Sequence, residues 1–487
     1  MKLKKLIQGL KLEVKGSKEI EISGLSSDSR RTAPGNLFIA KKGSSLDGNE
    51  YIARAIDSGA SAILTQFYNP FVKIPQLIHP DPQTIEAQLA SRYYNSPSND
   101  LFVVGVTGTN GKTTTTYLIK HLLDALKKPC GLIGTVETIL GRKRSFSTLT
   151  THDVLSNQKL LREMIEEGCQ AAVLEVSSHG LDQGRVGQVQ FDVALFTNLT
   201  PDHLDYHANE EEYALAKKRL FQLLDKSVKP RKTAIANADD PRHVQLLDGC
   251  FSPQILFGMS EKADLRAEAI ELSLKGSRFT ACYKGDAQVF TTPLIGRFNI
   301  YNLLGAIAVG LHYGCTLKEM APLFAHVKAA PGRLETVESR TGKHIFVDYA
   351  HTSDALFNVL TTLKAITKKR IITVFGAGGS RDPGRRIGLA KAAESHSDLC
   401  IITSDNPRQE DPQEICRQIL SAFQAPEKAR VELDRKKAIE LAIAQAEPGD
   451  AVLIAGKGHE RMQIFSHQTV PFDDREVAIS ALIREEG

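Results

Sequence analysis

The chain has 487 residues, which at about 150 residues per domain suggests roughly three domains. Its 61 basic and 57 acidic residues leave a net charge of +4. A nucleic-acid or membrane-surface binder carries a clustered basic excess, so neither kind of partner is expected. The seven cysteines include no Cys-x-x-Cys pair, and the chain begins without the apolar core of a signal peptide. These features predict a cytoplasmic protein.

The first region, residues 1–98, mixes short strand-like runs with one small helix and ends in a turn-rich stretch around residues 94–100. This stretch contains Asn, Ser and Pro, which favour turns, so we interpret it as a linker. The runs predict strands at residues 19–22, 36–40 and 61–65 and a helix around 51–58.

The second region, residues 99–330, opens with an apolar run at 101–106 that is typical of a buried parallel strand. A glycine-rich loop and a helix with leucines on one face follow it. This alternation predicts a parallel sheet with helices on both faces. Further strands are expected at residues 171–176, 192–198 and 233–237.

The third region, residues 331–487, repeats the alternation and predicts a second doubly wound α/β unit. Such sheets bind their ligands beyond the carboxyl ends of the strands. Strands are expected at residues 344–349, 370–375, 399–403 and 451–455, and helices at 353–366, 384–396, 411–423 and 435–446.

A phosphate-binding loop is the strongest motif, with a strand before it and a helix after it. Its glycines let backbone N–H groups point inward, and the helix N-terminus adds a partial positive charge. We expect Lys112 to reach the β- and γ-phosphates of ATP and Thr113 to hold Mg²⁺. The alternative is a tight turn with an exposed lysine. The predicted ATP-binding residues of the loop are Gly108, Thr109, Asn110, Gly111, Lys112, Thr113 and Thr114.

Two polar positions follow neighbouring predicted strands in the second region. Glu175 ends one strand, and His203 lies in a polar cluster beyond the next. Both are candidate magnesium ligands: Glu175 because a hard oxygen ligand suits Mg²⁺ at such an edge, and His203 because of the dense polar cluster around it. The alternatives are a capping glutamate and a structural histidine. Lys217 lies on a predicted helix, where the sequence alone indicates a solvated lysine.

Two arginines follow strand ends in the third region, Arg381 and Arg408. Their guanidinium groups would suit a ligand with a free carboxylate if they converge on one crevice. Glu460 follows the last long strand and would suit an ammonium group. The run from Asp405 to Pro407 is also a common turn starter, which explains those three residues without any ligand.

Several motifs together resemble the Mur ligase superfamily, which consists of ATP-dependent amide-forming ligases. The loop Thr107-Gly-Thr-Asn-Gly-Lys-Thr-Thr114 has Val106 at the usual first glycine position, as in that family. The resemblance extends over essentially the whole chain. It implies a three-domain α/β architecture with a central P-loop ATPase parallel sheet and a C-terminal Rossmann-like domain. The implied domains are 1–98 for the UDP-sugar, 99–330 for ATP and 331–487 for the amino acid.

The resemblance also implies roles for individual residues around ATP. Lys217 matches a lysine that CO₂ converts to a carbamate, and Glu175 and His203 match the magnesium ligands, so two Mg²⁺ ions are expected. Asn299 matches an adenine-side motif, Arg333 the hinge arginine that approaches ATP, and Asp348 the ribose contact. Asp348 taken alone is equally a helix cap. The implied catalytic residues are Lys112, Lys217, Glu175 and His203.

The remaining matches concern the two other substrates. Ser29 matches the uridine-diphosphate loop. The muramoyl-dipeptide contacts match Thr150, Thr151, Ser177, Gln183 and Arg185, although His152 stands where the family often has proline. The third region resembles the family branch that adds meso-diaminopimelate, whose contacts match Arg381, Asp405, Asn406, Pro407, Arg408, Gly456 and Glu460.

The implied activity is ATP-dependent addition of meso-diaminopimelate to the D-glutamate of UDP-N-acetylmuramoyl-L-alanyl-D-glutamate. It would proceed through an acyl phosphate, in peptidoglycan precursor synthesis, and the protein is expected to be a monomer. A lysine-adding relative would lack Arg408, since lysine has no second carboxylate. A folylpolyglutamate-type ligase would lack the first domain. A P-loop nucleotide switch would need neither Lys217 nor an amino-acid site.

Overall fold

The computed structural model describes residues 1–43, 46–203 and 206–486. By its internal contacts the chain divides into two compact units. The first comprises residues 1–265 and 305–314, and the second comprises residues 266–304 and 315–487. The division into three domains at residues 98 and 330 stays a prediction.

The N-terminal residues of the first unit form a five-stranded sheet in the order β1-β5-β4-β3-β2, parallel except at the edge strand β1. Leu37, Leu64 and Leu77 of this sheet share a core with the flanking helices. The elements are α1 (Leu3–Leu6), β1 (Glu13–Lys15), β2 (Gly24–Ser26), β3 (Asn36–Ile39), α2 (Ile52–Asp57), β4 (Ala62–Thr65), β5 (Gln76–Ile78) and α3 (Pro82–Tyr93).

The strand predicted at residues 19–22 is wrong. This segment makes one isolated bridge, Lys2 to Glu21, and Ile22 N donates to Met1 O at 2.8 Å. It is extended, but it borders the first residues of the chain and not the sheet. Its alternating Ile20 and Ile22 therefore reflect local burial, which produces the same pattern as a strand.

The rest of the first unit contains a mainly parallel sheet in the order β13-β12-β11-β6-β10-β7-β8-β9, in which only β8 and β9 are antiparallel. The predicted parallel arrangement is confirmed there, and β6 lies at its centre. The strands are β6 (Phe102–Thr107), β7 (Cys130–Ile133), β8 (Glu137–Leu140), β9 (Lys143–Phe146), β10 (Ala171–Glu175), β11 (Val193–Phe196), β12 (Thr233–Asn237) and β13 (Gln254–Gly258).

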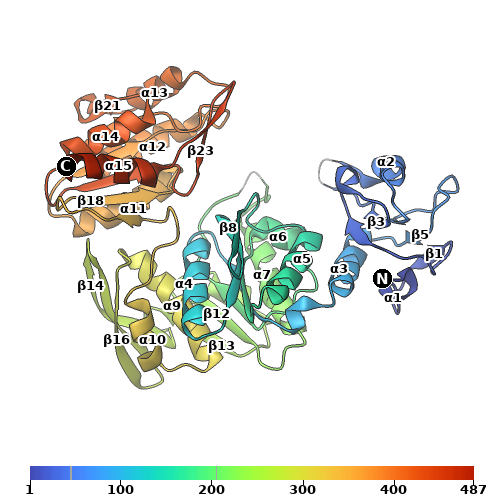
Figure 1. Ribbon diagram of the computed structural model, residues 1–487. Coiled ribbons are helices and arrows are strands. Elements are labelled where there is room, and N and C mark those ends of the chain that lie inside the picture. The colour runs from blue at the N-terminus through green and yellow to red at the C-terminus, as the bar shows by residue number, and fades with distance from the viewer. Residues whose placement is uncertain (44–45, 204–205, 487) are drawn as a thin grey trace. The chain divides into compact units, whose positions relative to one another are not determined.

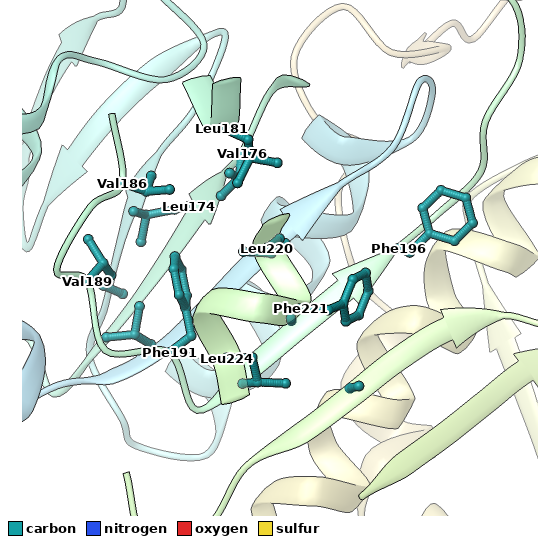
Figure 2. Close-up of a cluster of buried hydrophobic side chains, with 14 of the residues drawn as sticks. Leu174, Val176, Leu181, Val186, Val189, Phe191, Phe196, Leu220, Phe221 and Leu224 are labelled. Carbon is teal, nitrogen blue, oxygen red and sulfur yellow. The ribbon is translucent and has the colours of Figure 1, made fainter. Parts of the chain in front are cut away.

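Helix α7 is fixed to this sheet by its apolar face. Leu220, Phe221 and Leu224 pack in one cluster with Phe191 and Phe196, as Figure 2 shows. Burying a large apolar side chain contributes about 1.5–3 kcal/mol, so three of them fix the rotation of the helix. The helices are α4 (Lys112–Ala125), α5 (Val154–Glu166), α6 (Ser178–Asp182), α7 (Glu210–Lys226) and α8 (His243–Leu247).

The second unit begins with an antiparallel meander in the order β14-β15-β16, which the sequence did not predict. Partly or fully exposed residues interrupt the buried ones along these strands, so no continuous apolar run marks them. The elements are β14 (Leu265–Ser273), β15 (Gly276–Tyr283), β16 (Asp286–Thr292), α9 (Arg297–Tyr313), which continues into the first unit, and α10 (Leu317–Phe324).

The C-terminal residues form a six-stranded sheet in the order β17-β18-β22-β19-β20-β21, with its helices labelled in Figure 1. Successive residues of its strands face opposite sides and enter two different cores. Helices α11–α13 cover one face and α14 and α15 the other. The elements are β17 (Glu335–Val337), β18 (His344–Asp348), α11 (Ser353–Ile366), β19 (Ile371–Phe375), α12 (Gly384–His396), β20 (Leu399–Ile402), α13 (Pro412–Ser421), β21 (Ala429–Val431), α14 (Arg435–Gln445), β22 (Ala451–Ala455), β23 (Met462–Ile464), β24 (Thr469–Pro471) and α15 (Asp474–Glu486).

Helices long and apolar enough to cross a membrane are absent from the described part of the chain.

Candidate active site

The phosphate loop connects β6 to α4 and is held by the segment that follows β11. Thr109 N donates to Asn198 O at 2.8 Å, and Asn110 N donates to Asn198 Oδ1 at 3.0 Å. At Gly108 the backbone has φ +148°, and a Cβ atom would lie 1.9 Å from Thr197 Oγ1. Glycine is therefore required there by both conformation and space.

Lys112 begins α4 and lies over the loop. Its Nζ donates to the carbonyl oxygens of Gly108 at 2.9 Å and Thr109 at 2.8 Å. The loop thus has the structure that the motif predicts: a strand, a glycine turn and a helix N-terminus with a cation above it. Such an arrangement favours phosphate groups.

Thr113 and Glu175 meet at the carboxyl edge of the sheet. Thr113 Oγ1 donates to Glu175 Oε2 at 3.0 Å, and both side chains are buried. Thr135, which follows β7, donates to the same carboxylate from its N at 3.0 Å and its Oγ1 at 2.8 Å. A hydroxyl and a carboxylate at this distance form the kind of oxygen donor pair that holds Mg²⁺ in P-loop enzymes.

Lys217 is buried, and the interpretation as a solvated lysine is wrong for this residue. Its exposure is 1%, its Nζ donates to Gly108 O at 2.9 Å, and the same atom lies 4.3 Å from the centre of the Tyr213 ring. Burial, and secondarily the charge of Lys112, hold the pKa of Lys217 well below its usual value. A lysine with such a pKa has a larger fraction of neutral, reactive amine.

His203 lies less deeply than the residues around it. Its side chain is 47% exposed and its Nε2 is 3.6 Å from Asp202 Oδ2. Its ring lies 5.0 Å from that of His179 and 6.1 Å from that of Tyr213, between ring centres. Within the described ranges, no three His, Cys, Asp or Glu side chains are arranged to hold a metal ion. The role of His203 as a magnesium ligand stays a prediction.

The residues predicted to contact the muramoyl dipeptide form one network with Glu175. Thr151 Oγ1 donates to Glu175 O at 2.9 Å and lies 3.1 Å from Ser177 Oγ. Arg185 Nη1 donates to Thr151 O at 2.8 Å, and its Nη2 donates to Gln183 Oε1 at 2.7 Å. Thr150 joins the network because its Oγ1 lies within hydrogen-bond distance of Thr135 Oγ1, at 3.1 Å. The structure therefore brings these five residues together.

Ser29, the predicted uridine-diphosphate contact, lies after β2 and is buried at the start of a short 3-10 turn, Ser29–Arg31. Asp28 caps this turn, since its side chain accepts a bond from Arg30 N at 3.0 Å.

Asn299, Arg333 and Asp348 belong to the second unit. Asn299 is buried in the first turn of α9, where its Nδ2 donates to Ile295 O at 2.9 Å. Asp348 ends β18 and accepts bonds from Leu334 N at 2.6 Å and Ala350 N at 2.7 Å. Burial raises the pKa of Asp348, against the opposing charge of Arg333. Their nucleotide contacts stay predictions.

Three loops converge at the carboxyl ends of β19, β20 and β22, which are neighbours in the C-terminal sheet. Arg408 Nη1 donates to Gly379 O at 2.7 Å, and Gly379 N donates to Asn406 O at 3.0 Å. A Cβ atom on Gly378 would lie 3.0 Å from Arg408 Nη1 and 4.0 Å from Arg381 Cγ. The two arginine side chains thus approach the same glycine, while the convergence of their guanidinium groups on one carboxylate stays a prediction.

Asp405 and Gly456 are in close contact beside these arginines. Gly456 has φ +113°, and a Cβ atom there would lie 2.7 Å from Asp405 Oδ2. Gly379 packs against Pro407, whose carbonyl oxygen would be 1.9 Å from a Cβ at that glycine. Glu460 accepts bonds from Asn406 Nδ2 at 2.8 Å and from Lys457 Nζ at 3.0 Å. All seven residues predicted for the amino acid therefore lie on these three loops.

Sequence reasoning missed Thr135, Tyr213 and Lys457. Tyr213 precedes Lys217 by four residues on α7, a spacing that puts both on one helix face and could have identified it. Thr135 comes shortly after a strand end, as Glu175 does. Lys457 lies between two predicted contacts, but nothing in its immediate neighbours indicates that it is fully buried.

Known proteins resemble the chain over its whole length. Family models described as Mur ligase family catalytic domain, Mur ligase middle domain, and Mur ligase glutamate ligase domain match residues 21–94, 106–310 and 332–458. A UDP-N-acetylmuramoyl-L-alanyl-D-glutamate–2,6-diaminopimelate ligase from Chlamydia felis is 44% identical over 99% of both chains. The ligase of the same name from Geobacillus thermodenitrificans is 42% identical over 95% of both.

A solved structure of a UDP-N-acetylmuramoyl-L-alanyl-D-glutamate–2,6-diaminopimelate ligase is 30% identical to the chain. The likeness covers 100% of this chain and 99% of the other, with a TM-score of 0.75. The expected α/β architecture is thus confirmed, and the chain belongs to the Mur ligase family.

Proposed function

We propose that the chain joins meso-diaminopimelate to the D-glutamyl residue of UDP-N-acetylmuramoyl-L-alanyl-D-glutamate, and that ATP is converted to ADP and phosphate. The observation that carries this assignment is that the side chains of Arg381 and Arg408 both approach Gly378, and that Glu460 is hydrogen-bonded to Asn406 on the same loop as Arg408. Diaminopimelate has a second carboxylate and a second ammonium group, and this cluster offers a counter-charge to each. The similarity of nearly the whole chain to diaminopimelate ligases supports the same substrate.

The phosphate loop would bind ATP through its backbone amides, the N-terminus of α4 and Lys112. Thr113 and Glu175 fit a Mg²⁺ ion, because both offer oxygen atoms, lie 3.0 Å apart and are buried. His203 and a modified Lys217 would complete the ligands of a second ion. When bound, the ions would offset the negative charge of the phosphates and of the attacking carboxylate.

Lys217 fits carbamylation for two reasons. Its lowered pKa favours the neutral amine, which adds CO₂ to give a carbamate and a proton. Its Nζ also shares the acceptor Gly108 O with Lys112, so two cations lie close together in a buried place. A carbamate on Lys217 would be an anion, so the repulsion between the two ammonium groups would become an attraction between the carbamate and Lys112. It would also supply anionic oxygens where Mg²⁺ is expected.

The network of Thr151, Ser177 and Arg185 would place the D-glutamyl carboxylate. One oxygen of that carboxylate attacks the γ-phosphorus, and the bond between this phosphorus and the ADP oxygen breaks. Lys112 offsets charge on the transferred group. The amine of diaminopimelate then attacks the acyl carbon of the acyl phosphate and loses a proton, and phosphate leaves as the amide forms.

The deciding assay measures phosphate release with the UDP-muramoyl dipeptide and ATP, adding meso-diaminopimelate or L-lysine in turn. We expect release that depends on diaminopimelate and a coupled increase in the tripeptide product. A preference for lysine would change the assignment to the lysine-adding branch. Release that ignores both amino acids would indicate a nucleotide switch. Sedimentation of the same preparation tests the expected monomer, and cell fractionation tests the expected cytoplasmic location.

A further inference from the structure

Lys457 is a buried cation at the edge of the amino-acid loops. It follows β22, its side chain is fully buried, and its Nζ donates to Asn406 Oδ1 and Glu460 Oε2, each at 3.0 Å. Burying an ammonium group costs several kcal/mol unless it is paired and hydrogen-bonded. A lysine in this position therefore needs both partners, and it fixes both of them in return.

Asn406 closes the network from the other side. Its Nδ2 donates to Glu460 Oε2 at 2.8 Å, and its Oδ1 accepts a second bond, from Ile464 N at 3.0 Å. These contacts determine the orientation of the amide, because only the oxygen can accept from Lys457 and from Ile464 N. Glu460 Oε2 thus has two donors from side chains that cannot easily move.

The hydrogen bonds from Asn406 and Lys457 both engage Glu460 Oε2, while the side chain remains 34% exposed. A carboxylate fixed through one oxygen presents the other in a defined direction. Arg381 and Arg408 lie on the neighbouring loops. A ligand that offers an ammonium group beside a carboxylate would meet Glu460 with the first group and the arginines with the second.

We infer that Lys457 is a positioning residue for amino-acid selection: with Asn406 it fixes Glu460 so that this carboxylate receives the distal ammonium group of diaminopimelate. The inference rests on the proposed function. Lys457 itself does not contact the substrate in this arrangement. Its removal should therefore affect recognition of the distal ammonium group and leave the other substrates unaffected.

The test compares meso-diaminopimelate with 2-aminopimelate, which keeps both carboxylates but lacks the distal amine. The quantity is the ratio of kcat/KM for the two amino acids in the coupled phosphate assay. In Lys457→Met we expect this ratio to fall at least tenfold, with kcat/KM for 2-aminopimelate and the KM values for ATP and the UDP-dipeptide within threefold of wild type. Lys436→Met, an exposed lysine of the same domain, is the matched control and should keep the wild-type ratio.

A double-mutant cycle sharpens the assignment. Glu460→Gln alone should lower the ratio as Lys457→Met does, and the two changes together should lower it no further, because both act through one contact. Additive effects, an unchanged ratio in Lys457→Met, or an equal loss for both amino acids would each overturn the inference.

Two further measurements keep the test decisive. Thermal unfolding establishes that the variants fold. If Lys457→Met does not fold, Asn406→Asp is measured in its place. Its new carboxylate lies beside Lys457 and draws the ammonium group away from Glu460, so the ratio should fall. An unchanged ratio in Asn406→Asp overturns the inference. Wild-type protein that releases no phosphate with diaminopimelate overturns the proposed function and this inference together. A wild-type preference that survives the substitutions overturns the inference alone.

Discussion

Each unit of the protein buries one lysine beside a loop that follows a central strand, but the two lysines have different partners. Lys217 donates to a carbonyl oxygen and lies over a tyrosine ring, and it takes part in no ion pair found among the described residues. Lys457 has the carboxylate of Glu460 at 3.0 Å. A buried lysine without an anion is driven toward the neutral amine, whereas one with an anion serves as a fixed cation. This difference supports the proposed reactive role of Lys217 and a structural role for Lys457.

The largest effect is expected from removing the reactive lysine. Lys217→Ala should lower kcat roughly 100-fold or more, because it removes the group that the proposed carbamate would use to hold Mg²⁺ near the transferred phosphate. Short carboxylates added to the assay should restore part of this activity. Lys218→Ala is the control, since the salt bridge of Lys218 with Asp248 is near the surface and worth about 0–1 kcal/mol. A wild-type kcat in Lys217→Ala would contradict the proposed catalytic role and leave Lys217 as a buried structural lysine, like Lys457.

The next effect concerns the anion-binding side of the second unit. Arg408→Ala should cost about 2–3 kcal/mol in transition-state binding of diaminopimelate, which is roughly 30- to 150-fold in kcat/KM. Any residual activity with L-lysine should not fall, because lysine has no second carboxylate. Arg417→Ala, an exposed arginine of α13, provides the comparison. An equal decrease in kcat/KM for both amino acids would show that Arg408 stabilises the loop and does not bind the second carboxylate of diaminopimelate.

A smaller effect is expected at the metal position. Thr113→Ala removes the hydroxyl 3.0 Å from Glu175 Oε2, so the Mg²⁺ concentration for half-maximal activity should rise about tenfold. Thr116→Ala, on the same helix, tests for a general effect on α4, since Thr116 Oγ1 donates to the backbone of Thr113. Titration of activity with Mg²⁺ distinguishes the two variants. An unchanged requirement in Thr113→Ala would contradict the proposed metal role.

A separate effect, on stability and not on activity, extends the comparison to a second buried base of the first unit. Burial lowers the pKa of His312 to about 4, and its Nδ1 lies 2.8 Å from Thr233 Oγ1. The unfolded chain binds this proton near pH 6.5 and the folded chain only near pH 4. The free energy of unfolding is therefore unaffected by His312 above about pH 6.5. It decreases between about pH 6.5 and pH 4, by an amount of the order of 2–3 kcal/mol.

His312→Gln should flatten this pH dependence of the free energy of unfolding, measured by denaturant titration at several pH values. The exposed His326 provides the matched variant, His326→Gln, which should leave the slope as it is. A slope that persists in His312→Gln would assign the acid sensitivity to other groups.

The sequence predicted those features that depend on short stretches of chain. The phosphate loop, the parallel strands around β6 and the four central strands of the C-terminal sheet each have a local pattern of apolar runs and turns. Arg381 and Arg408 follow strand ends that a doubly wound sheet brings to one edge, so the sequence could indicate that their loops are neighbours. The resemblance to the Mur ligases supplied most of the remaining site residues.

The features that sequence reasoning missed depend on contacts between distant residues. The burial of Lys217 results from the docking of α7 through Leu220, Phe221 and Leu224. Lys457 meets Asn406, 51 residues away in the chain. The meander β14-β15-β16 has one exposed face, so its strands lack the continuous apolar run that marked the others. In each case the feature depends on which distant residues the fold brings into contact, and a short stretch of sequence does not show this.

The carbonyl oxygen of Gly108 receives both Lys112 and Lys217. Two ammonium groups on one acceptor disfavour the doubly charged state before any substrate arrives, so the loop itself promotes one neutral amine. Under the proposed carbamylation, Lys217 would need no dedicated enzyme, and the modified fraction would follow the concentration of dissolved CO₂. Preparations of the protein handled in degassed or acidic buffer would differ in activity from those kept in bicarbonate, although their sequences and folds are identical.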